Sequence, residues 1–307
     1  MFIINNKKIF LSIAGLVALM SLVSVAVLGV KFSIEFTGGS MLQVSYEEEN
    51  VPSFTEVESV ISAIDFNQSF VLQEAGDSGY IVRTRDLNEE ERVDLINRLS
   101  FEDYSAQEER FSSVGPSVGD ELANKAMTAI VLVVIAIILF IAYVFRGVSK
   151  PVSSWKYGGA AVIALMFDIL VPVGIFSVLG FYLGAEIDIL FVTALLAILG
   201  FSVNDTIVVF DRIRENLKIN EEFQIKKSFP QTVGESLEQT YVRSINTSIT
   251  TLFVLGALFF VGPEVTQFFA LVLIVGVVAG TYSSLFLASP FLVTLEEIQK
   301  NKGKESK

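Results

Sequence analysis

The sequence predicts an α-helical integral membrane protein with six transmembrane helices and one inserted α+β ferredoxin-like domain outside the membrane. The 307 residues are 52% hydrophobic, with a mean hydropathy of +0.59, and their apolar residues gather into six runs of the length, about 20 residues, that crosses a bilayer. Residues 31–125 hold 20 acidic and 7 basic residues, a net charge of −13, so that the rest of the chain sums to +1 of the total −12. That acidic segment therefore reads as a solvated domain.

The first apolar run, Ile9–Val30, follows Lys7 and Lys8. A cleaved signal peptide is the alternative, but its apolar core would have only about 7–15 residues, and this run has no Ala-x-Ala exit. The other spans are expected at Ala126–Phe145, Gly158–Leu183, Ile189–Phe210, Ser244–Val261 and Val265–Leu295. The predicted divisions are thus 1–30 (N-terminus and first span), 31–125 (inserted domain), 126–295 (five spans, with a loop at 211–241) and 296–307 (basic tail).

The inserted segment alternates strand-like and helix-like patterns. Ser53 with Glu56, and Asn88 with Glu91, are placed to cap the two helices expected at Phe54–Ile64 and up to Leu99. A glycine pair, Gly38-Gly39, marks a tight turn before the first strand. Strands are expected at Met41–Tyr46, Ser69–Glu74, Tyr80–Arg85 and Ala106–Val114. The order β-α-β-β-α-β is that of the ferredoxin-like plan.

Loop charges predict the orientation. Lysines and arginines occur at the N-terminus, after spans two and four, and at the C-terminus, whereas the short loops after spans three and five contain none. Because basic residues favour the cytoplasmic side, both termini are expected to be cytoplasmic and the acidic domain extracytoplasmic.

Two acids and an arginine lie inside the predicted spans, where a charge costs about 2.5–3.5 kcal/mol. Asp205, beside Asn204, is expected in the cytoplasmic third of span four, and Asp168 near the middle of span three. Arg243 opens span five, with Thr247 one helical turn later. If spans four and five are neighbours, Asp205 and Arg243 approach each other and form either a reversible proton carrier or a fixed brace between helices.

Composition excludes several classes of function. The chain has neither Cys nor His, which removes thiol chemistry and His-ligated metal sites, and no nucleophile–base set, phosphate loop or metal-ligand spacing is present. No basic patch indicates nucleic acid. We therefore expect no enzyme, no metal and no cofactor. Gly276-Val-Val-Ala-Gly280, continued by Ser284, is typical of close helix packing.

Four blocks resemble the SecD/SecF family of bacterial protein-export membrane proteins, in the family's order and over nearly the whole chain. The first two are Phe36-Thr-Gly-Gly39 and Val114-Gly-Pro-Ser-Val118. The third, the most specific, joins Gly200-Phe-Ser-Val-Asn-Asp205 to Asp211-Arg-Ile-Arg-Glu-Asn216, and the fourth is Arg243-Ser-Ile-Asn-Thr-Ser-Ile-Thr-Thr251. The signature positions are Gly38, Gly39, Asn204, Asp211, Arg212, Arg214, Glu215 and Asn216.

The resemblance implies half of a resistance-nodulation-division-type transmembrane fold in the bacterial cytoplasmic membrane. Its partners would be SecD, the SecYEG translocon with YajC, the translocating unfolded polypeptide, protons and membrane lipid. The implied function is to use the proton motive force to promote translocation of secreted polypeptides after the ATP-driven step. Asp205, Arg243 and Thr247 match the family's proton path. Asp168 is also assigned to this proton path, although the family often has His-Asp where this chain has Phe167-Asp168.

Two alternatives stay open at this point. A small-molecule exporter of the same superfamily would share the driving chemistry, but such exporters usually carry twelve spans and two large outer domains. A passive scaffold that stabilises the translocon would use Asp205 and Arg243 only as a brace, and its effect would survive collapse of the proton gradient.

Overall fold

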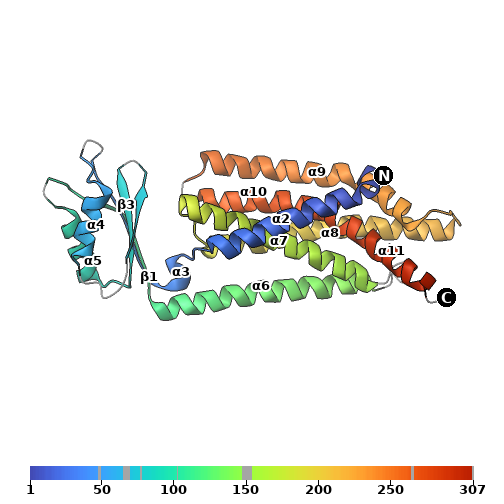
Figure 1. Ribbon diagram of the computed structural model, residues 1–307, viewed down its shortest axis with the longest axis horizontal. Coiled ribbons are helices and arrows are strands. Elements are labelled where there is room, and N and C mark those ends of the chain that lie inside the picture. Colours follow the sequence, from blue (N-terminus) through green and yellow to red (C-terminus); the bar gives the residue numbers. More distant parts are fainter. Residues whose placement is uncertain are drawn as a thin grey trace. The chain divides into compact units, whose positions relative to one another are not determined.

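The computed structural model describes residues 1–47, 50–64, 70–76, 78–101, 103–146, 154–263 and 266–305. The chain divides into two compact units, one formed by Phe32–Thr128 and the other by Met1–Lys31 with Ala129–Lys307 (Figure 1). The sequence places the corresponding divisions at 31 and 125. Ser69, Lys307 and Val265, which the sequence assigns to a strand, the tail and the sixth span, lie outside the described residues.

The smaller unit contains a four-stranded sheet with helices in the predicted order. A short helix, α3 (Ile34–Thr37), comes first, and the sequence gives no indication of it. The β-α-β-β-α-β order then follows, with sheet order β2-β3-β1-β4 and every neighbouring pair antiparallel. The elements are β1 (Gly39–Ser45), α4 (Phe54–Ser62), β2 (Val71–Ala75), β3 (Gly79–Thr84), α5 (Glu89–Leu99) and β4 (Gln107–Val114). The ferredoxin-like prediction is confirmed.

Local chemistry starts both helices of this unit where the sequence predicts. Ser53 and Glu56 form a capping box at α4, and Asn88 and Glu91 form one at α5. The helices bury apolar residues against one face of the sheet, in a core that includes Leu42, Val44, Val57, Ile61, Val82, Leu95 and Leu99. In Figure 1, α4 and α5 lie together on one side of the sheet.

The glycine pair at the start of β1 makes close backbone contacts, Gly38 with the start of α6 (Pro116–Val144) and Gly39 with the end of β3. Gly38 and Gly39 have φ of +71° and +114°, values that favour glycine. A Cβ atom on Gly38 would lie 2.8 Å from the Pro116 Cα, and one on Gly39 would lie 2.5 Å from the Thr84 carbonyl oxygen. Two of the sequence blocks, Phe36–Gly39 and Val114–Val118, therefore meet in one tight joint.

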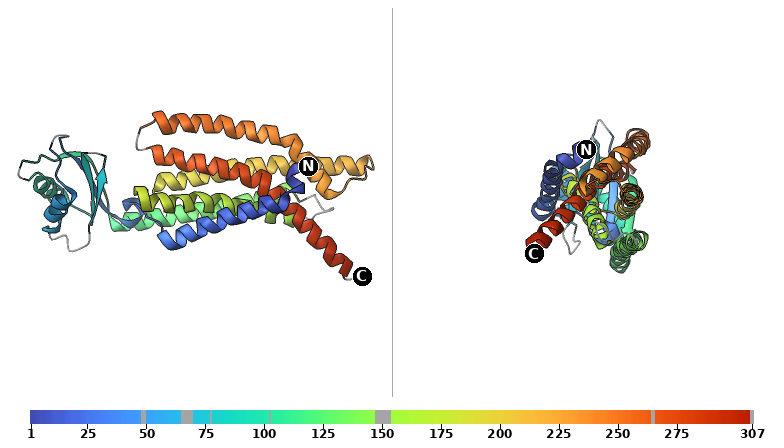
Figure 2. Two further views of the ribbon diagram at one scale, coloured as in Figure 1. Left: turned by 45° about the horizontal axis from the view of Figure 1, so that its top comes forward. Right: turned by 90° about the vertical axis from the view of Figure 1, so that its right-hand side faces the viewer.

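The larger unit is a helical bundle. Six helices of the described chain are long and apolar enough to cross a membrane, which makes this a multi-pass membrane protein (Figure 2). Three of these spans, α7, α8 and the last, are at least half buried over their most apolar stretch, whereas α2, α6 and α9 are at most 17% buried. The three well-buried spans, α7, α8 and the last span (Gln267–Lys300), therefore form the centre of the bundle. The bundle elements are α1 (Phe2–Asn5), α2 (Lys7–Leu28), the membrane part of α6, α7 (Ser154–Leu183), α8 (Ile189–Glu222), α9 (Phe229–Val261), α10 (Gln267–Tyr282), a π-helical turn (Ser283–Ala288) and α11 (Ser289–Glu305).

The segment 211–241, which the sequence assigns to a loop between spans four and five, is mostly helical. α8 continues to Glu222 and α9 already begins at Phe229, so that only 223–228 is a turn. The charges that end the apolar run at Phe210 do not end the helix, because Ile213, Leu217 and Val233 continue an apolar contact between the two helices. The two helices form a hairpin that reaches beyond the apolar spans.

The glycines of α10 allow close contact with α8. A Cβ on Gly276 would lie 2.1 Å from Ile198 Cδ1, and one on Gly280 would lie 2.9 Å from Ser202 Cβ. The expectation of close helix packing at Gly276–Gly280 is confirmed. A similar contact joins α2 and α7, where Ser24 donates a hydrogen bond of 2.9 Å to the Gly174 carbonyl.

Candidate functional site

Asp205 lies inside the bundle, 16 residues along α8 and thus about 24 Å from its start. Its side chain is 5% exposed. The guanidinium of Arg243 acts on it electrostatically, and the Ser244 side chain lies beside it. Among the described residues no ion pair or hydrogen bond joins Asp205 to Arg243, and neither Asp205 Oδ2 nor Ser244 Oγ has a hydrogen-bond partner. The carboxylate is thus attracted to its cation without being locked to it.

Arg243 and Thr247 share a face of α9 that is exposed in the isolated chain. Both residues are exposed, as is Asn204 on α8. The Thr247 hydroxyl donates to the Arg243 carbonyl at 2.9 Å, so it is engaged with its own helix. The structure brings Asp205 and Arg243 within electrostatic range, but it shows no contact between Thr247 and Asp205.

The polar run at the start of the fifth span divides between two faces. Ser244 and Ser248 are buried, whereas Asn246, Thr247 and Thr250 are exposed. The Ser248 and Thr281 hydroxyls share a hydrogen bond of 2.6 Å between α9 and α10. The run is therefore not one continuous lining, because a helix turns its neighbouring residues by about 100° each.

Asp168 is the most enclosed acid of the spans, with no exposed surface. Ser202 of α8 donates a hydrogen bond to its Oδ2. The other oxygen, Oδ1, has no partner in the described structure. Ser202 precedes Asp205 by three residues, so α8 carries the contact to Asp168 about one turn away from the second acid.

A group of buried hydroxyls surrounds Ser202. The sequence analysis does not predict this group. The Ser284 hydroxyl, in the π-helical turn, bonds to Thr206 at 2.8 Å and donates to the Ser202 carbonyl at 3.2 Å. The only sequence indication of this group is that Ser202 lies within the Gly200–Asp205 block. That indication is weak, because serines in apolar helices commonly bond only to their own backbone. π-helical turns are frequent at functional sites.

The charged part of the third sequence block lies outside the carboxylate site. Arg212 donates to Gln239 at 2.5 Å and Asn216 donates to Ser236 at 2.8 Å, both across the α8–α9 hairpin. Ion pairs also run along α8 itself: Arg212 pairs with Glu215 at 2.5 Å, and Arg214 pairs with Asp211 at 3.7 Å. Gly38 and Gly39 belong to the other unit.

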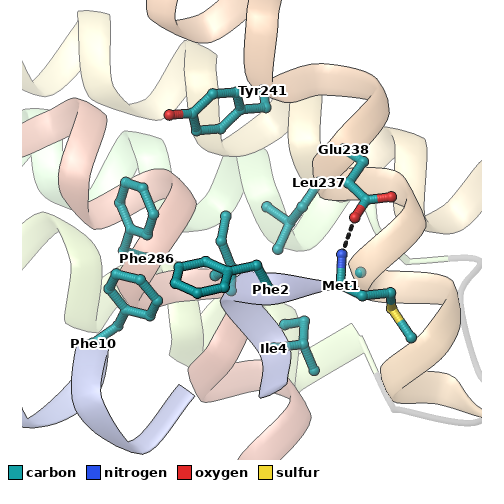
Figure 3. Close-up of a pocket in the computed structure, with 10 residues that line it drawn as sticks. Met1, Phe2, Ile4, Phe10, Leu237, Glu238, Tyr241 and Phe286 are labelled. Atoms are coloured by element: carbon teal, nitrogen blue, oxygen red, sulfur yellow. Dashed lines mark hydrogen bonds and ion pairs between the residues drawn. The ribbon is translucent and has the colours of Figure 1, made fainter. Parts of the chain in front are cut away.

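A cavity of about 460 Å³ lies at the end of the bundle near Met1, away from these acids (Figure 3). Phe2, Phe10, Phe286 and Tyr241 turn their rings toward it, and the Met1 amino group pairs with Glu238 at its edge. None of the predicted site residues lines this cavity. Within the described ranges, no three acidic side chains come together to hold a metal ion. A carboxyl group inside a span can bind and release a proton, and its surroundings decide which form is favoured.

Comparison with family models identifies two matching regions. The model described as protein export membrane protein SecD/SecF, C-terminal, matches residues 96–298, and the SecD/SecF GG motif matches residues 23–49. A protein translocase subunit SecF from Thermobaculum terrenum is 39% identical over 310 residues, which cover 96% of this chain and 93% of the relative. Another, from Anaerolinea thermophila, is 35% identical over 297 residues, 96% of this chain and 94% of the relative.

Solved structures show the same relationship. The crystal structure of SecDF, a translocon-associated membrane protein from Thermus thermophilus, matches with a TM-score of 0.79 at 30% identity, over 96% of this chain and 38% of that chain. SecDF in its super-membrane-facing form matches with a TM-score of 0.69 at 29% identity, over 99% of this chain and 40% of that chain. This chain therefore spans about two-fifths of SecDF.

Proposed function

The chain belongs to the SecD/SecF family of protein-export membrane proteins, and we propose that it is a SecF-type translocase subunit that uses the proton motive force to promote polypeptide export after the ATP-driven step. The observation that carries the proton-driven part is Asp205, a buried carboxylate in a span that is attracted to Arg243 without an ion pair. A carboxylate in this setting can exchange a proton without first breaking a bonded pair.

The proposed cycle couples protonation to helix packing. Adding a proton to Asp205 removes its attraction to Arg243 and loosens α8 against α9. The inserted domain, which is joined to the spans through α2 and α6, follows the change in packing. One charge that crosses 100 mV supplies about 2.3 kcal/mol, so a few protons per cycle are enough to bias a domain movement. Asp168, linked to α8 through Ser202, would be a second proton position.

The exposed polar face supports SecD as the partner. Arg243, Asn204 and Thr247 point outward from the isolated chain, and a charge facing lipid is costly. A second set of spans would cover this face, and the SecDF chains, which are about two and a half times as long as their match to this chain, are long enough to include one. We place the complex in the bacterial cytoplasmic membrane, with both termini cytoplasmic and residues 31–125 outside, beside SecYEG and YajC.

The test is export into vesicles reconstituted with this chain, SecD and the translocon. We expect Asp205→Asn to abolish the stimulation of export by the proton motive force, because asparagine keeps the shape of the side chain but cannot exchange a proton. Glu222→Gln, which neutralises an exposed acid at the end of the same helix, is the matched control and should leave the stimulation intact. Full stimulation in Asp205→Asn would contradict the proton-carrier role and favour a scaffold.

A further inference from the structure

A polar seam joins the two helices of the α8–α9 hairpin beyond the apolar spans. On α8 it consists of Arg212, Asn216 and Asn220, spaced four residues apart along one face. On α9 it consists of Thr232, Ser236 and Gln239. Four hydrogen bonds connect the two sides: Arg212 Nε to Gln239 Oε1 at 2.5 Å, Asn216 Nδ2 to Gln239 Oε1 at 2.9 Å, Asn216 Nδ2 to Ser236 Oγ at 2.8 Å, and Asn220 Nδ2 to Thr232 Oγ1 at 3.0 Å.

The seam fixes a single register between the helices. The bonded positions run antiparallel: as α8 advances from Arg212 to Asn216 and Asn220, the partner on α9 moves back from Gln239 to Ser236 and Thr232. Gln239 also accepts from Asn216 and so bridges two successive positions of α8. The apolar contact beneath, which includes Ile213 and Val233, is non-directional and would tolerate a small slip. Hydrogen bonds lose their geometry within a fraction of an ångström. The polar side chains therefore specify the alignment.

The seam lies on the same helix faces as the acid and its cation. Arg212 follows Asp205 by seven residues, two turns of α8, and Gln239 precedes Arg243 by four residues, about one turn of α9. A slip of one residue along α9 would turn Arg243 by about 100° and move it by about 1.5 Å. That displacement would turn the guanidinium group away from Asp205 and weaken the attraction between the two charges.

We propose that the polar seam is a positioning device that sets the register of α8 against α9 and so holds Arg243 within electrostatic range of Asp205. The proposal rests on the proposed function of Asp205 and gives a role to Arg212 and Asn216 of the sequence block. The helices packed against α8 carry other titratable groups, namely Lys156, Tyr157, Asp168 and Tyr182 on α7, Glu235, Glu238 and Tyr241 on α9, and Tyr282 on α10. The charge that acts on Asp205 is that of Arg243.

The readout is the pH profile of Asp205 modification by a hydrophobic carbodiimide, which reacts with protonated carboxyl groups. The full chain is reconstituted with SecD in vesicles, and mass spectrometry of the peptide that contains Asp205 separates it from Asp168. We expect Asn216→Leu to shift the midpoint of the profile by at least about half a pH unit, because the distance to a neighbouring charge changes. Lys218→Leu, on the exposed side of the same helix, is the control and should leave the profile unchanged.

A swapped pair separates positioning from general stability. Asn220→Thr alone should shift the profile, and Asn220→Thr with Thr232→Asn should restore it, because the bond is rebuilt with its partners exchanged and side-chain volume kept. An unchanged profile in both single variants, a shift of equal size in Lys218→Leu, or a failure of the swap to restore the profile would each overturn the proposal. If Asn216→Leu does not fold, the swap decides the question. The labelling requires no export, so failure of the proposed function is seen separately in the Asp205→Asn export assay.

Discussion

Asp205 and Asp168 differ in whether a cation acts on them. Arg243 acts on Asp205, whereas the described surroundings of Asp168 offer a hydrogen bond from Ser202, the nearby hydroxyl of Ser283, and no partner for Oδ1. A carboxylate out of water is costly unless it is paired and hydrogen-bonded. Asp168 thus depends on Ser202, and Ser202 in turn is held close by Gly280, which lacks a Cβ where it meets Ser202.

Ser202→Ala should therefore destabilise the bundle by about 1–3 kcal/mol, because it leaves a buried carboxyl group without its donor. Reversible unfolding in mixed detergent micelles measures this loss. In Asp168→Asn the same substitution should cost less, since the group left without a partner is an amide. Equal costs in the two backgrounds would show that Ser202 and Asp168 do not depend on each other.

The inserted domain has a pH dependence of its own. A hydrogen bond from the Arg85 side chain, followed by the Asn88 backbone bond, lowers the pKa of Glu91 from 4.5 to about 2. A lowered pKa in the folded state gives stability that is complete above the unfolded value and is lost as pH falls through the folded one. Protection of the α5 amides against hydrogen exchange, corrected for intrinsic rates, should therefore decline between about pH 4.5 and pH 2.

Glu91→Gln should flatten that decline, because the titrating group is gone. Glu90→Gln, which changes an exposed acid in the same first turn of α5, serves as the control and should keep the decline. A decline of the same size in Glu91→Gln and in the unmodified chain would show that other carboxyl groups account for it.

At the scale of elements, local signals were sufficient for the inserted domain but not for the hairpin. Capping residues and alternating strands gave the order of Phe54–Ile64 and its neighbours, because those signals act within a few residues. The end of α8 is not predicted from the sequence, because the charges after Phe210 are typical of a loop between spans. The helix continues because Ile213 and Leu217 pack against α9. Likewise, the sequence alone does not predict which face of α9 is buried, because that depends on which helices pack against it.

Close packing of α10 on α8 gives a direct prediction. Gly276→Ala should destabilise the bundle by about 1–3 kcal/mol, because the new methyl group would lie 2.1 Å from Ile198 Cδ1. Gly200→Ala, where nothing lies within 4 Å of the new atom, should be neutral or slightly stabilising in the isolated chain. Thermal unfolding in detergent compares the two. Similar effects at both positions would contradict the packing described.

At the scale of the whole molecule, the outward polar face implies an assembly. A single cysteine is informative here because the chain has none of its own. In Thr247→Cys, at an exposed position next to Arg243 on the same face of α9, maleimide labelling in detergent should be fast for the chain alone and at least about tenfold slower after co-purification with SecD. An unrelated six-span protein in place of SecD is the control. Unchanged labelling with SecD would place the partner elsewhere.

Proton flux is the measurement closest to the central claim, that Asp205 carries the protons that drive export. Vesicles with this chain, SecD and the translocon, loaded with a pH-sensitive dye, report flux while a polypeptide is engaged. We predict flux in the unmodified chain, its loss in Asp205→Asn, and partial recovery in Asp205→Glu, which retains a carboxyl group. Flux in Asp205→Asn equal to that of the unmodified chain would contradict the account.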